Sequence, residues 1–104
     1  MNNVSEAVTI EAVEIVKQTI RESMGPFGLR DVHVRAGEDH DGDPVLFIEA
    51  LYDLSETPVD PSVTARLVSI LRDRLWKFGE RRFPHIRHKF DEHQEVQRAR
   101  RAKA

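Results

Sequence analysis

The feature that most constrains the fold is a change in hydrophobic period at the glycine–proline pair 25–26. Before this pair, apolar residues recur every three or four positions, which predicts one amphipathic helix from about Glu6 to Ser23, with Ser5 as its N-cap. After it, apolar and polar residues alternate from Asp31 to Ala36, as in a half-buried strand. Glycine followed by proline cannot continue a helix. The chain is therefore expected to turn from a helix into a sheet here.

A second strand is expected from Val45 to Leu54, a mostly apolar run rich in strand-forming residues. The expected buried face of this strand consists of Leu46, Ile48, Ala50 and Tyr52. The segment between the two strands, "GEDHDGD" at 37–43, is acidic and contains glycine. Such a connection is typical of a β-hairpin.

A second helix should begin at Asp60 and Pro61, because aspartate is a good N-cap and proline fits the first turn. The helix should end at Gly79 or run to Arg82, just before Phe83 and Pro84, and a short third strand is expected over 85–90. The expected buried stripe of the helix consists of Val63, Leu67, Ile70, Leu71, Leu75 and Phe78.

The resulting order is α–β–β–α–(β), which predicts an α+β fold, a two-layer sandwich in which two helices cover an antiparallel hairpin sheet. The length of 104 residues suits one domain, which we place at 1–96. The remaining residues, 97–104, are predicted to form a basic, flexible tail.

The absence of cysteine excludes a disulfide scaffold, a cysteine-ligated metal and a thiol nucleophile, and it fits a cytoplasmic location. No apolar run approaches the roughly 20 residues needed to cross a bilayer. The sequence also contains no G-x-S-x-G or P-loop motif. A non-enzymatic protein without a cofactor is therefore expected.

Charge is divided unevenly along the chain. Residues 1–60 carry 4 basic and 13 acidic side chains, a formal charge of −9, whereas residues 61–104 carry 12 and 5, a charge of +7. Such a division indicates either a nucleic-acid-binding face or two halves that attract each other, within one molecule or between two.

The acidic segment 37–43 matches a calcium-binding loop only in part. Asp39, Asp41 and Asp43 have the alternate spacing of a calcium-binding EF-hand loop, but Gly42 stands at position 4 of that loop instead of 6, and the twelfth position is Ala50 instead of glutamate. Aspartate and glycine are also ordinary turn residues. The pattern favours a solvated hairpin end, and no dedicated metal site is predicted.

Three histidines near the C-terminus, His85, His88 and His93, allow a weak third hypothesis, a metal-dependent hydrolase. If 85–90 is a strand, His85 and His88 point to opposite faces and cannot share an ion. Ordinary surface histidines are the better interpretation.

The segment from Arg66 to Lys89 is strongly basic and contains aromatic residues, a combination that suits sequence-tolerant binding of nucleic acid. The alternative function is therefore a nucleic-acid-binding domain. Its candidate contact residues are Arg72, Lys77, Arg81, Arg82, Arg87 and Lys89.

Two residues break the pattern of the second helix. Arg74 falls within the apolar stripe, where we expect its head to lie in water or to pair with an acid such as Glu49 or Asp53. Trp76 falls on the polar side, where an exposed tryptophan suggests either a contact with a partner or coverage by the C-terminal segment of the chain.

The first functional hypothesis is thus a small binding or adaptor module that acts through a protein partner or self-association, most simply as a homodimer. Its candidate partner-binding residues are Trp76, Arg72, Arg81 and Arg82.

Overall fold

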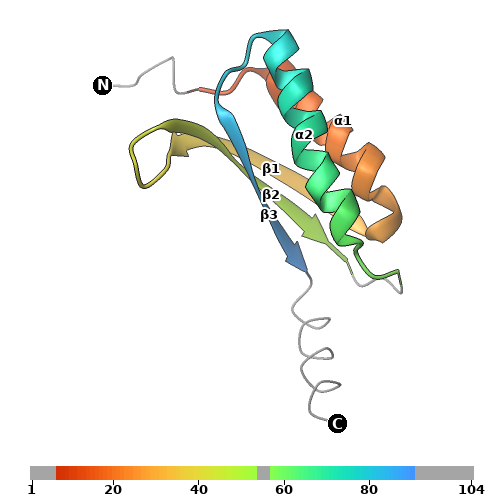
Figure 1. Cartoon of the computed structure of the whole chain (residues 1–104). Helices are drawn as coiled ribbons and strands as arrows, with labels where there is room; N and C mark the ends of the chain where they lie inside the picture. The colour runs from red at the N-terminus through yellow and green to blue at the C-terminus, as the bar shows by residue number, and fades with distance from the viewer. Residues whose placement is uncertain (1–6, 54–56, 91–104) are drawn as a thin grey trace.

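The computed structural model describes residues 7–53 and 57–90 and confirms the predicted α–β–β–α–β order (Figure 1). The elements are α1 (Ile10–Met24), a 3₁₀ turn (Gly25–Phe27), β1 (Leu29–Glu38), β2 (Pro44–Tyr52), α2 (Pro61–Phe78) and β3 (Phe83–Phe90). The proposed tail at 97–104, together with Ser5, Glu6 and Leu54, lies outside the described residues.

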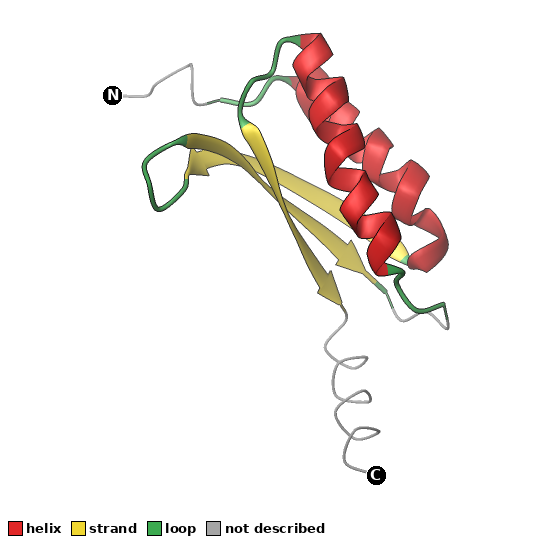
Figure 2. Cartoon of the chain, in the orientation of Figure 1, coloured by secondary structure: helices red, strands yellow, loops and turns green. Residues whose placement is uncertain are grey.

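The three strands form one sheet in the order β1–β2–β3, and both helices pack on the same face of it (Figure 2). β1 and β2 form the predicted antiparallel hairpin, whereas β3 runs parallel to β2, so the sheet is mixed. The predicted two-layer α+β sandwich is confirmed. Among the described residues, no helix lies on the other face of the sheet. Neither described helix has the length and apolarity of a membrane span.

Local sequence signals set most of the element ends. Asp60 caps α2 by accepting the backbone N–H of Ser62 at 2.9 Å, as predicted. Gly79 ends α2 at a φ of 107°, in the left-handed region that favours glycine. The predicted start of the first helix is wrong, because α1 begins at Ile10 with the Thr9 hydroxyl as its N-cap.

The core lies between the helices and the sheet. α1 contributes its apolar stripe, and β2 contributes the predicted face, on which each side chain is at most 1% exposed. The buried residues of the core are Ala12, Val16, Ile20, Met24, Val32, Leu46, Ile48, Ala50, Tyr52, Leu67, Leu71 and Leu75.

Two predictions for α2 need correction. Phe78 is not a core residue, because it lies at the last position of the helix and is 47% exposed. Arg74 pairs with Glu22 of α1 at 2.8 Å and not with Glu49 or Asp53. Its guanidinium also donates to the buried hydroxyl of Thr19 at 3.1 Å. Arg74 therefore joins the two helices, which explains a cation on the apolar stripe.

Candidate functional site

The C-terminal end of α2 brings Trp76 and Arg81 together. Gly79 donates its N–H to the carbonyl groups of Leu75 and Trp76, and Glu80 donates to Leu75, so the chain reverses directly after the helix. The Arg81 guanidinium then lies 4.0 Å from the centre of the Trp76 ring, a cation–π contact.

A second cation–π pair lies beside the first. Arg72 is one helical turn before Trp76, and its guanidinium lies 4.9 Å from the ring centre of Phe83, the first residue of β3. Neither Arg72 nor Arg81 has a carboxylate within ion-pair distance among the described residues.

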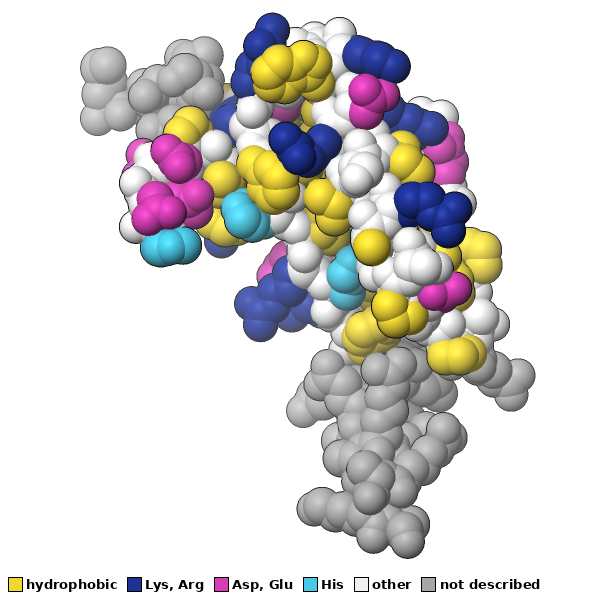
Figure 3. All heavy atoms as spheres, in the orientation of Figure 1, with side chains coloured by type: hydrophobic (Ala, Val, Ile, Leu, Met, Phe, Trp, Pro, Cys, Tyr) yellow, Lys and Arg dark blue, Asp and Glu magenta, His cyan; other side chains and the backbone are white. Residues whose placement is uncertain are grey.

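Arg72, Trp76, Arg81 and Phe83 line one small hollow of about 80 Å³, and we call these four residues the cation–aromatic patch. Trp76 is 56% exposed and Phe83 is 39% exposed, which is unusual for large apolar side chains. Figure 3 shows basic and hydrophobic side chains side by side over this part of α2 and β3. The patch thus contains three of the four residues predicted to bind a partner.

The fourth predicted contact residue, Arg82, lines the same hollow together with Glu80, but its guanidinium is held within the molecule. Its guanidinium donates to both carboxylate oxygens of Glu80, from Nε and from Nη2, each at 2.8 Å, and Nη2 also donates to the carbonyl of Ala7 at 3.0 Å. The Arg82 and Glu80 side chains are only 14% and 11% exposed. The hydrogen bond from Arg82 is the main reason why the pKa of Glu80 lies below its ordinary value.

The structure does not bring the six candidate nucleic-acid residues onto one surface. Lys77 pairs with Asp73 at 3.0 Å, and Lys89 pairs with Glu49 at 3.5 Å. Arg87 lies on the uncovered face of the sheet, next to Glu49 in the β2–β3 register. Only Arg72 and Arg81 occupy the patch.

An aromatic cluster on the uncovered sheet face was not predicted from the sequence. The His85 ring lies 6.0 Å from Phe47 and 5.1 Å from Phe83, and the Arg35 guanidinium lies 4.4 Å from the centre of Phe47. The Phe47 ring covers Gly37, where an added Cβ would lie only 2.6 Å from Cε2. Because these residues belong to three strands, only the strand register could have revealed the cluster.

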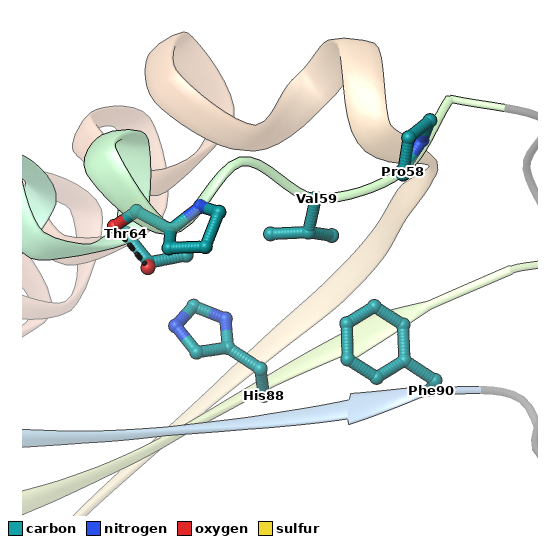
Figure 4. Close-up of a pocket in the computed structure, with 6 residues that line it drawn as sticks. Pro58, Val59, Thr64, His88 and Phe90 are labelled. Atoms are coloured by element: carbon teal, nitrogen blue, oxygen red, sulfur yellow. Dashed lines mark hydrogen bonds between the residues drawn. The ribbon is translucent and has the colours of Figure 1, made fainter.

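His88 points to the opposite side of β3 and lines a hollow of about 470 Å³ near the start of α2 (Figure 4). Its Nδ1 is hydrogen-bonded to the buried Tyr52 hydroxyl at 2.6 Å, and burial lowers the pKa of His88. His85 is exposed on the other face, so the two histidines do not converge, and His93 lies outside the described residues.

The end of the hairpin is an ordered turn. The Asp39 carboxylate accepts the backbone N–H groups of Asp41 at 2.9 Å and Asp43 at 3.0 Å, and these bonds lower the pKa of Asp39. Gly42 adopts a φ of 85°. Ligand atoms of the three aspartates lie within 4.8 Å of one another, but turn geometry accounts for this clustering.

No protein-family model matches the chain, and no curated protein is significantly similar to it. One similar solved structure is the zinc form of CzrB, described as a "Putative Zinc Transporter". The two chains are 17% identical, the TM-score is 0.41, and the similarity covers 88% of this chain and 92% of the other. A similarity of this size carries no argument about what this chain binds.

Proposed function

We propose that this protein is a small, non-enzymatic binding module that self-associates, with the cation–aromatic patch in the contact surface. The observation that carries the proposal is the exposed pair Trp76 and Phe83, each covered on one face by an arginine. Tryptophan and arginine are among the residues that contribute most to binding at protein interfaces. A cytoplasmic location, which the absence of cysteine fits, stays a prediction.

Two properties of the whole chain support self-association in particular. The acidic first part and the basic second part carry charges of −9 and +7, so two copies can attract each other. The three-stranded sheet also has an uncovered face that bears Phe47, His85 and Phe83. A second copy could cover this apolar area, as small domains often do.

The proposal is tested by sedimentation of the Trp76→Glu variant. Trp76 is more than half exposed, so the substitution should leave the far-UV circular dichroism spectrum unchanged. We expect it to weaken the dimer by about tenfold or more, because a hot-spot side chain is lost and a charge is placed at the contact. Ala65→Glu is the matched control, because Ala65 is exposed near the start of α2, at the opposite end of this helix from Trp76.

If both variants sediment like the wild-type dimer, the patch is not part of the contact surface. An equal loss of dimer in both variants would also contradict the proposal, because the effect would then not depend on the patch.

The second candidate is sequence-tolerant binding of single-stranded nucleic acid. The observation that favours it is the row of aromatic rings beside Arg72, Arg81 and Arg35, which could stack bases and neutralise phosphates. Binding of a labelled oligonucleotide should then fall steeply with salt, and Arg72→Glu with Arg81→Glu should reduce the slope. No binding at low salt would exclude this candidate.

A further inference from the structure

The arginines of the cation–aromatic patch differ from most of the other cations near them. Arg74, Lys77 and Arg82 each have a carboxylate within 3.0 Å. Arg72 and Arg81 have aromatic rings but no carboxylate at ion-pair distance among residues 7–53 and 57–90. An anion from outside the molecule would therefore complement the patch.

The chain itself carries a matching anionic segment, the end of the β1–β2 hairpin from Glu38 to Asp43, which we call the acidic hairpin end. Its exposed carboxylates are those of Glu38, Asp41 and Asp43, and none of them pairs with a lysine or arginine in the described part of the chain. The segment extends beyond the helical layer (Figure 1). It is therefore free to contact a second molecule.

The two charged surfaces lie on either side of Phe83. On one side, Phe83 is paired in the sheet with Val45, two residues after Asp43. On the other side, Phe83 contacts Arg72. Figure 3 shows the acidic group at the hairpin end, then hydrophobic side chains, then basic ones. An acidic, an apolar and a basic area thus follow one another along this surface. Such a surface is complementary in charge to a copy of itself rotated by 180°.

A single molecule cannot bring its own two surfaces together. The hairpin is held by a continuous antiparallel register from Asp31–Leu51 to Glu38–Pro44, and its turn is fixed by the bonds to Asp39. Folding the acidic end onto Arg72 would break this ladder. The same acids also argue against nucleic acid as the occupant, because they would repel phosphates beside the patch.

We propose that the acidic hairpin end of one copy docks on Arg72 and Arg81 of a second copy, with the two Phe83 rings near the two-fold axis. This inference rests on the proposed self-association and names the segments that meet. Each dimer then contains the acid–arginine contact twice.

The test is a charge exchange followed by sedimentation. The hairpin variant carries Asp41→Lys and Asp43→Lys, and the patch variant carries Arg72→Glu and Arg81→Glu. Asp39 is left intact because it holds the turn. Each variant alone should dimerise at least about tenfold more weakly, because both contacts become repulsive. An equimolar mixture should recover the wild-type affinity to within about threefold, because the two variants attract each other.

Glu11→Lys with Glu14→Lys is the matched control, since these exposed acids of α1 give the same change in net charge as the hairpin variant. The control should dimerise like the wild type. A dimer that the patch variant weakens but the hairpin variant does not, or a mixture that fails to recover, overturns the docking and leaves the proposed function standing. A dimer that neither variant weakens overturns both. A wild type that is monomeric at about 100 μM, well above the micromolar range of modest interfaces, overturns both.

Discussion

Replacing Arg82 with alanine should destabilise the protein by about 2–3 kcal/mol, far more than the same change at the adjacent Arg81. The Arg82 side chain donates to both carboxylate oxygens of Glu80 and to the carbonyl of Ala7, and it is only 14% exposed. Arg81 is exposed and contacts the Trp76 ring.

The magnitude follows from what the substitution leaves behind. Breaking a fully buried ion pair costs about 3–5 kcal/mol, because the remaining charge loses its partner. The Glu80 carboxylate keeps backbone N–H donors, among them that of Arg82 at 3.0 Å, and it is not completely shielded from water. The cost should therefore fall below that range. Loss of the Arg81 cation–π contact at an exposed site should cost about 0.5–1 kcal/mol.

Urea unfolding of both variants at one low protein concentration measures the difference, because dimerisation adds a concentration-dependent term at higher concentration. The pH dependence provides a second check. Arg82 lowers the pKa of Glu80 in the folded state, so the stability from this pair is complete above the ordinary glutamate pKa and is lost as pH falls through the folded value. The Arg82→Ala variant should therefore lose less stability than the wild type as the pH falls over this range. Equal stability of the two variants would refute the structural role of Arg82.

Three further predictions concern the core, the buried histidine and the hairpin. Leu71→Ala should lower the free energy of unfolding by about 2–5 kcal/mol in urea titrations, because Leu71 is fully buried, and a loss below about 1 kcal/mol would contradict its place in the core. Burial lowers the folded-state pKa of His88, so its contribution to stability is complete above the ordinary histidine pKa and declines as pH falls below it. Thermal unfolding at several pH values should show this decline in the wild type and a smaller one in His88→Gln, and equal declines would contradict it. Calorimetry should find no calcium dissociation constant tighter than about 10⁻⁵ M, and a tighter one would show that the aspartates form a dedicated site.

The sequence predicted the fold well where local chemistry determines it. The glycine–proline break, the Asp60 cap and the alternation in β2 depend on neighbouring residues, and the structure confirms each of them. The predicted start of α1 is too early because Ser5 and Thr9 are both good N-caps. Nothing nearby in the chain distinguishes the two.

The candidate site was predictable only in part, because it depends on contacts between distant residues. The exposure of Trp76 followed from the helical wheel, but its contact with Arg81 required the chain reversal at Gly79. The charges of Arg82 and Glu80 alone did not predict that the two side chains form a largely buried ion pair. Spacing along the chain also gave no sign that Phe47 and His85 would meet across two strands.

Sedimentation equilibrium of the wild-type protein at low salt, from about 1 to 100 μM, tests the central claim most directly. The account predicts a monomer–dimer equilibrium that shifts toward monomer as salt is raised, because the contact pairs acids with arginines that are exposed in the monomer. A single monomeric species at about 100 μM would contradict it.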